Sequence, residues 1–136
     1  MTNSKIPRGI RNNNPLNIRI GNNWLGKVKN PTDNEFEQFM HVSFGLRAGF
    51  ILLKRYINRY KLNTIEKIIS RWAPGNENNT LSYIGNVAKR MNIDPDTPLL
   101  YEDRDTMCAL VYAMIYVENG QHIQMAEIVR AYQMVN

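Results

Sequence analysis

A single carboxylate, Glu118, ends an uncharged run from Met107 to Val117 and is followed by Asn-Gly. A helix that is apolar on every side is buried, and the carbonyl groups at its C-terminal end carry partial negative charge. Both surroundings disfavour the ionised form of an acid, so the pKa of Glu118 is expected to be raised. A raised pKa suits a general acid near neutral pH. The alternative, left open by these residues alone, is a side chain that turns into solvent.

Two other stretches combine aromatic rings with side-chain amides, which are the usual groups of a carbohydrate site because sugars stack on rings and exchange hydrogen bonds with amides. One is R-W-A-P-G-N-E-N-N-T-L-S-Y-I-G-N-V, residues 71–87, in which Trp72 and Tyr83 flank a polar loop. The other is N-N-N-P-L-N-I-R-I-G-N-N-W-L-G, residues 12–26, which contains Trp24. The alternative for both is that the rings belong to the core and the Asn residues form turns.

Other catalytic chemistries lack the residues that they need. His41 and His122 stand outside any ligand motif, so no metal site is expected. The chain has no phosphate-binding glycine loop with its lysine, no G-x-S-x-G and no nucleophile paired with histidine. The single cysteine, Cys108, lies in the apolar run and is expected to be a small buried residue. Acid–base chemistry without a metal or cofactor remains.

Helices must position these residues. One is predicted from a cap at Ser43 to about residue 60, and its buried face carries Leu46, Phe50, Leu53 and Ile57. The basic residues off this face are expected to form a solvated surface rather than a polymer-binding patch; they are Arg47, Lys54, Arg55 and Arg59.

Further helices are predicted along the rest of the chain. One starts at Asn63, carries Glu66 in a capping-box pattern and ends at Pro74-Gly75. The next is capped by Asn79 or Thr80. A helix from about residues 103–105 ends at Glu118, with Gly120 as its left-handed cap, and a last helix covers about residues 123–134.

The 136 residues, 43% of them hydrophobic, fit a single domain with a real core. We expect a mainly α fold around a buried central helix. A small irregular or β lobe is predicted over residues 1–40, with a short hairpin around Gly21 to Asn23, and a helical bundle over residues 43–136. The net charge of +5 favours an anionic partner such as a cell wall, nucleic acid or an acidic membrane surface.

In their order along the chain, these motifs resemble the lysozyme-like superfamily of peptidoglycan-cleaving enzymes. R-G-I-R-N-N-N-P-L-N-I-R is similar to the opening of phage and bacterial peptidoglycan hydrolases, with Leu16 where their pattern has Gly. F-E-Q-F-M-H-V-S-F-G-L-R-A-G-F and W-A-P-G-N-E-N-N-T-L-S-Y-I-G-N-V resemble later motifs of the same group. The likeness covers roughly residues 7–120 and implies an α+β lysozyme-like fold.

The order of the motifs implies a circular permutation. In this superfamily the catalytic glutamate ends a hydrophobic helix that precedes the N-P-x-N stretch, but only eleven residues, none acidic, precede Asn12 here. M-C-A-L-V-Y-A-M-I-Y-V-E-N-G resembles that missing helix at the other end of the chain. The resemblance therefore assigns the general acid to Glu118.

The resemblance also implies roles for other residues. Tyr83 would stabilise the charged intermediate or hold the sugar, and Glu77 is the best candidate for a second catalytic carboxylate, ahead of Glu35 and Glu37. An inverting hydrolase needs that second carboxylate to hold water, whereas a lytic transglycosylase uses a hydroxyl of the substrate. The expected glycan-binding residues are Asn14, Asn17, Asn79, Thr80, Trp24 and Trp72. For Asn17, Asn79 and Thr80 the alternative role is to position Glu118.

The function that this implies is cleavage of peptidoglycan glycan strands, as a muramidase or lytic transglycosylase without a cofactor. The alternatives are an inactive lysozyme-fold virion or glycan-binding protein and, less favoured, a basic nucleic-acid-binding module. No signal peptide is visible, and the apolar run is too short to span a bilayer, so we expect synthesis in the cytoplasm. Action in the periplasm or cell wall would then need delivery by a holin, a virion or a secretion system, and an immunity protein is a conceivable partner.

Overall fold

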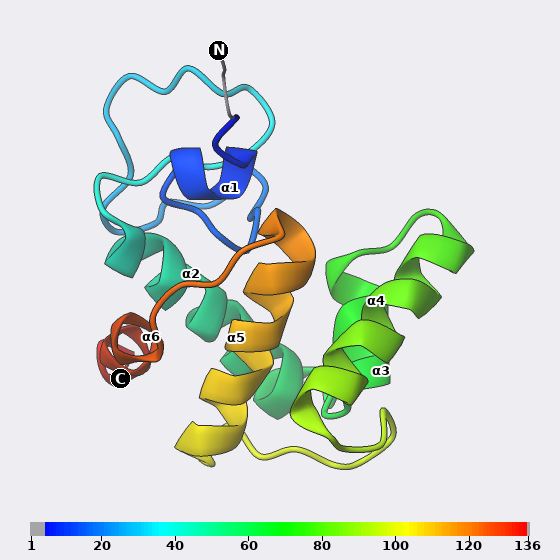
Figure 1. The fold of residues 1–136 in the computed structure, drawn as a ribbon. Helices are drawn as coiled ribbons and strands as arrows, with labels where there is room; N and C mark the ends of the chain where they lie inside the picture. The colour runs from blue at the N-terminus through cyan, green and yellow to red at the C-terminus, as the bar shows by residue number, and fades with distance from the viewer. Residues whose placement is uncertain (1–4, 136) are drawn as a thin grey trace.

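Helix α5, Arg104–Asn119, forms the centre of the molecule (Figure 1). In the computed structural model, which describes residues 5–135, α4 and α6 pack along α5 and α1 meets its C-terminal end. Asp103 caps its start by accepting a hydrogen bond from the backbone N–H of Thr106, and Gly120 ends it with a φ of 72°. Buried side chains line most of its length, so the prediction of a buried central helix that ends beside Glu118 is confirmed.

Helix α2, Val42–Lys54, and the π-helical turn η1, Arg55–Arg59, form one continuous rod. The predicted apolar face is buried, with Leu46, Phe50, Leu53 and Ile57 each at most 5% exposed. The predicted cap is wrong by two residues, because the ring of His41 accepts the hydrogen bond of the Ser43 backbone N–H. Helix α6, Met125–Gln133, packs against α2 and α5 and closes the bundle.

Helices α3, Ile65–Trp72, and α4, Glu77–Met91, form a pair beside α5 (Figure 1). The cap of α3 is Thr64 rather than Asn63. The cap of α4 is Asn76, so Asn79 and Thr80 lie within its first turn and not before it. In each case the sequence offers several neighbouring polar residues, and the one with an extended backbone supplies the cap.

The front lobe, residues 5–41, contains α1, Arg8–Arg11, and loops joined by short antiparallel pairings. The hairpin predicted around Gly21 to Asn23 is wrong. Residues 18–20 pair instead with residues 35–37, and a second bridge joins Lys27 to Phe39. The pairing therefore skips the nearest turn and joins Arg19 to Phe36, 17 positions further along the chain.

Asp33 holds the turn that makes this distant pairing possible. Its carboxylate accepts hydrogen bonds from Arg8 at 2.7 and 2.8 Å and from the Asn12 amide at 2.9 Å. The backbone N–H groups of Glu35 and Phe36 also donate to it. The hydrogen bonds from the Arg8 guanidinium are the main cause that holds the pKa of Asp33 well below its usual range. Polar contacts rather than a sheet thus shape this lobe.

Cys108 is buried, as predicted. Burial raises the pKa of its thiol to about 11. No helix within residues 5–135 has the length and apolar character needed to cross a bilayer. Residues 1–4 and 136 of the predicted 1–136 domain lie outside the described residues.

Candidate functional site

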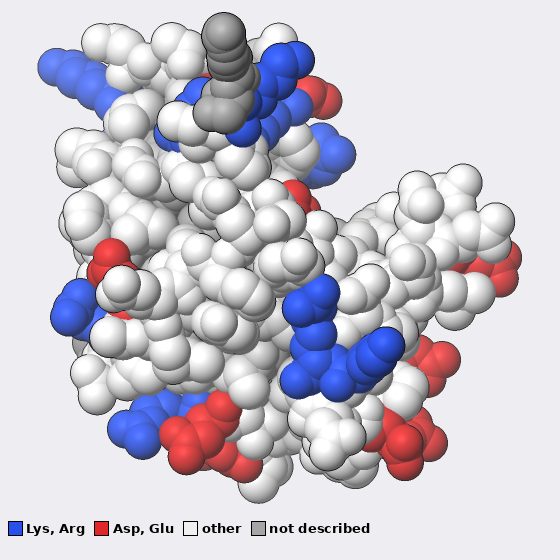
Figure 2. All heavy atoms as spheres, in the orientation of Figure 1, with Lys and Arg blue, Asp and Glu red and all other residues white. Residues whose placement is uncertain are grey.

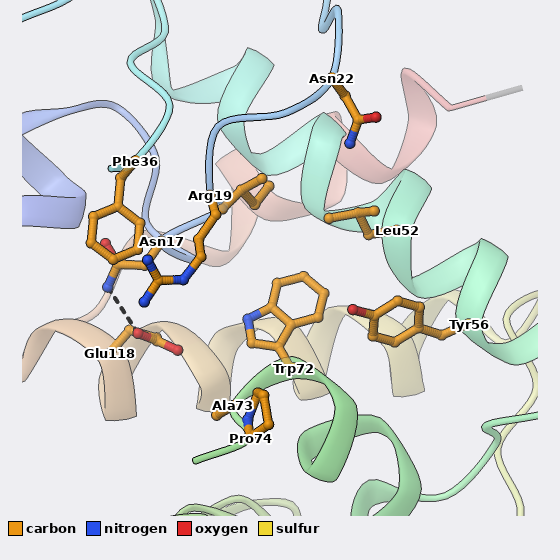
Figure 3. A pocket seen from close by; sticks show the side chains of 11 residues that line it. Asn17, Arg19, Asn22, Phe36, Leu52, Tyr56, Trp72, Ala73, Pro74 and Glu118 are labelled. Carbon is orange, nitrogen blue, oxygen red and sulfur yellow. Dashed lines mark hydrogen bonds between the residues drawn. The ribbon is translucent and has the colours of Figure 1, made fainter. Parts of the chain in front are cut away.

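A cleft of about 460 Å³ lies where the front lobe, the α2–η1 rod, the end of α3 and the C-terminal end of α5 meet (Figure 3). On the face shown in Figure 2, the surface is hollowed between the front lobe and the α3–α4 pair. The cleft is lined by Asn17, Ile18, Arg19, Asn22, Phe36, Leu52, Tyr56, Trp72, Ala73, Pro74 and Glu118.

Glu118 lies at one end of this cleft, with Trp72 in the middle (Figure 3). The Asn17 amide donates to Oε1 at 2.8 Å, and the Tyr83 hydroxyl donates to Oε2 at 3.0 Å. Burial raises the pKa of Glu118, and the two hydrogen bonds oppose that rise without cancelling it. The expected direction of the pKa is therefore confirmed, and the side chain faces a cleft rather than bulk solvent.

Backbone conformation aims Asn17 at the acid. Asn17 and Asn13 have φ values of 53° and 54°, a left-handed region that asparagine enters more readily than most residues. Leu16, which stands where the resembling pattern has Gly, is fully buried. Gly49 leaves it room, since a Cβ there would come within 2.3 Å of Leu16 Cδ1. The turn thus forms with Leu16 in place.

Asn119 fastens the front lobe to α5, a role that the sequence reasoning missed. Its Nδ2 donates to the Pro15 carbonyl at 2.7 Å and to the Ile115 carbonyl at 3.0 Å. Gly9 permits this close approach, because a Cβ there would come within 2.6 Å of Asn119 Oδ1 and 2.9 Å of Asn17 Oδ1. In the sequence, Asn119 stands in E-N-G, a pattern that indicates the end of a helix and nothing about a contact with the front lobe.

Tyr83 contacts the acid but not the cleft. Tyr83 lies on α4 and is 7% exposed. Burial is the main cause that raises the pKa of its hydroxyl well above 10, and the nearby Glu118 raises it further. The hydroxyl is therefore a neutral donor that fixes the position of the carboxylate. Trp72 does line the cleft. Its Nε1 donates to the Leu16 carbonyl at 3.3 Å, so the ring is held with one edge on the lobe.

Two of the expected glycan-binding residues are structural. Asn14 is fully buried, its Nδ2 donates to the carbonyls of Ile18 and Glu37, and its Oδ1 accepts from the Ile18 backbone. It ties the lobe together and cannot reach a ligand in the cleft. Trp24 is 9% exposed in the core of the lobe. Residue type alone did not separate Asn14 from Asn17.

The residues of the first turn of α4 also lie outside the lining of the cleft. Glu77 and Asn79 are exposed there. The Thr80 hydroxyl donates to the Ala73 carbonyl at 2.6 Å, so it secures the loop between α3 and α4. The predicted loop position of Glu77 is wrong because the helix begins at that residue.

No second carboxylate reaches the cleft from the residues that the structure describes. Glu35 is exposed and pairs with Arg8 at 3.0 Å, while Glu37 is buried with one oxygen 3.5 Å from Lys27 Nζ. Neither these two nor Glu77 is a lining residue, and Glu118 is the one acid in the lining. Within residues 5–135, no group of three or more His, Cys, Asp or Glu is placed to hold a metal ion.

Arg19, Asn22, Phe36 and Tyr56 line the cleft but were not predicted as site residues. The Arg19 guanidinium stacks over the Phe36 ring at 4.9 Å, above the acid in Figure 3. Phe36 lies in a motif that the sequence reasoning singled out, whereas Arg19 and Asn22 carried no separate signal.

Together these features define a mainly helical domain with an open cleft and a half-buried carboxyl at the end of its central helix. The sequence is 42% identical over 123 residues to Protein P5 of Pseudoalteromonas phage PM2, an alignment that covers 88% of this chain and 75% of the phage protein. The chain therefore belongs to the same family as this phage protein. No family model matches the sequence.

Proposed function

We propose that the protein cleaves the glycan strands of peptidoglycan by a reaction of the lytic transglycosylase type, with Glu118 as its acid. The observation that carries the proposal is the cleft itself. A carboxyl whose pKa is raised by burial lies at its end, an aromatic ring lies beside it, and the lining contains no other acid among the described residues. An inverting hydrolase would need a second carboxylate to hold water.

A single carboxyl suffices for the proposed reaction. Protonated Glu118 donates its proton to the glycosidic oxygen as the bond from that oxygen to the anomeric carbon breaks. The 6-hydroxyl of the same muramoyl sugar then attacks the anomeric carbon, and its proton returns to the Glu118 carboxylate. The hydrogen bonds from Asn17 and Tyr83 stabilise the carboxylate between the two transfers. The products are a free sugar hydroxyl and an anhydro-muramoyl end.

Two contacts support the resemblance to lysozyme-like enzymes and the circular permutation. Asn17, in the N-P-L-N stretch, contacts Glu118 although 101 positions separate them. Tyr83 contacts the same carboxylate from the third motif. The phage origin of the relative fits a lysin or a virion-borne enzyme, and a net charge of +5 favours approach to an anionic wall.

The test is product analysis on purified peptidoglycan. The wild type should release fragments with anhydro-muramoyl ends, and Glu118→Gln should lose at least about a hundredfold in rate because general acid catalysis contributes on that order. Glu127→Gln, which neutralises a glutamate on α6 that does not line the cleft, is the matched control and should keep full activity.

Two outcomes would contradict the proposal. Equal clearing of cell walls by the wild type and Glu118→Gln would remove Glu118 from the reaction. Reducing ends in place of anhydro ends would keep the acid but show hydrolysis, and the sugar that carries those ends would name the bond.

A further inference from the structure

A basic aromatic patch adjoins the end of the cleft opposite Glu118. We call it the outer patch and define it by Tyr56, Tyr60, Arg59 and Arg71. Tyr56 lines the cleft and packs edge-to-face on Trp72 with the ring centres 5.7 Å apart (Figure 3). The Arg71 guanidinium lies 5.8 Å from the Tyr56 ring centre and 5.4 Å from that of Tyr60. Aromatic surface thus leads from the cleft to the outside.

Two elements bring these residues together. Residues 55–59 form the π-helical turn η1, in which the Tyr60 backbone N–H donates to the Arg55 carbonyl at 3.2 Å. Such turns are rare and occur frequently at functional sites. Arg71 is the neighbour of Trp72 in the last turn of α3, and it is exposed while Trp72 lines the cleft.

The arginines of the outer patch are available to an anionic ligand. Arg59 lies 5.7 Å from the Tyr60 ring centre, and both arginines and Tyr60 are exposed. Within residues 5–135, neither Arg59 nor Arg71 has a carboxylate within salt-bridge distance. An arginine already stacked on a ring loses less side-chain freedom when it binds a carboxylate bidentately.

We propose that the outer patch binds the anionic peptide side chains of the glycan strand, beyond the bond that is cleaved. The inference rests on the proposed function and names the part of the substrate that this surface recognises. Rings suit sugars, and sugar hydroxyls accept hydrogen bonds from arginine, but an uncharged glycan offers no anion to pair with Arg59 and Arg71. Carboxylates of the peptides attached to the muramoyl sugars supply that partner. Arg59 is exposed, as the sequence analysis expected of a solvated surface, and the proposal gives that surface a ligand.

The test measures binding separately from cleavage. Glu118→Gln protein is co-sedimented with insoluble peptidoglycan before and after its peptide carboxylates have been converted to neutral amides. In this background, Arg59→Gln with Arg71→Gln should raise the apparent Kd for untreated peptidoglycan about tenfold and leave that for amidated peptidoglycan unchanged. Arg71→Lys should recover only part of the loss, because lysine lacks the planar guanidinium.

Arg130→Gln is the charge-matched control. Arg130 is exposed on α6, where it pairs with Glu127 at 3.1 Å, and its loss should change neither Kd. Equal weakening on both kinds of peptidoglycan, or no weakening, would overturn the inference. So would tighter binding of double-stranded DNA than of untreated peptidoglycan through the same two arginines. If the wild type failed to cleave peptidoglycan, the proposed function would be wrong. The inference about the outer patch would still be tested, because the binding preference is measured without cleavage.

Discussion

Removal of the Tyr83 hydroxyl should make Glu118 harder to ionise. In Tyr83→Phe the ring stays in its buried place on α4, but Oε2 of Glu118 loses the donor that now lies 3.0 Å away. That bond stabilises the carboxylate form and so lowers the pKa of Glu118 against the larger effect of burial. Without it the pKa of Glu118 rises further.

The size of the change follows from the geometry. A hydrogen bond to a charged group contributes about 1.5 kcal/mol net at the lower end of its range. Tyr83 is 7% exposed, which leaves little access for a water to replace the hydroxyl. Since about 1.4 kcal/mol is a factor of ten, the proton-dissociation constant of Glu118 should fall about tenfold. Activity that needs the protonated acid should persist to correspondingly higher pH.

NMR titration of protein labelled with 13C at the glutamate carboxyl carbons measures this directly. The Glu118 signal is identified by its absence from Glu118→Gln. Tyr132→Phe is the matched control, because it removes a tyrosine hydroxyl bond to the Tyr101 carbonyl at 2.8 Å, and neither of these residues hydrogen-bonds to Glu118 or lines the cleft. A Glu118 midpoint that stays in place, or moves to lower pH, in Tyr83→Phe would refute the reasoning.

Two further predictions concern stability. Because burial raises the folded-state pKa of Glu118, the stability conferred by its neutral form is present at low pH and is lost as the pH rises through that value. In denaturant unfolding, Glu118→Gln should therefore be more stable than the wild type near pH ~8 and equal to it near pH ~4. A gain in stability that grows toward acid pH would contradict this. Gly49→Ala should cost about 1–3 kcal/mol because its Cβ would meet buried Leu16 at 2.3 Å. Gly85→Ala, in an open, exposed helical position, should instead gain about 0.5–1 kcal/mol, and equal thermal shifts for the two would show that packing at Leu16 is not the cause.

Helical periodicity predicted the bundle well because each helix carries its own signal. The apolar spacing of α2 and the uncharged run of α5 both mark buried surfaces, and Gly120 marks the end of α5. The front lobe has no such period. Its pairing of Arg19 with Phe36 depends on the polar contacts of Asp33, and those join residues too far apart in sequence for a local rule to find.

The same distinction separates the site residues that were predicted from those that were not. Glu118 has a local anomaly, an acid at the negative end of an apolar helix, and that can be read from sequence. Asn14 and Asn17 have the same side chain in the same loop, yet one is fully buried and the other faces the acid. Asn17 has a positive φ and Asn14 does not, and Leu16 between them gave no sign of this.

The contacts of Glu118 also tie its protonation to the assembly of the fold. One carboxylate oxygen is held by Asn17 from the front lobe and the other by Tyr83 from α4, so neither donor comes from α5 itself. Asn119, the next residue on α5, holds the lobe through the Pro15 carbonyl. If the lobe separated from α5, the acid would lose the Asn17 donor and the burial that raises its pKa at the same moment. A carboxyl with a raised pKa beside a cleft therefore exists only when segments 101 positions apart are docked, and this gives the chain a functional reason to place E-N-G at the end of its central helix.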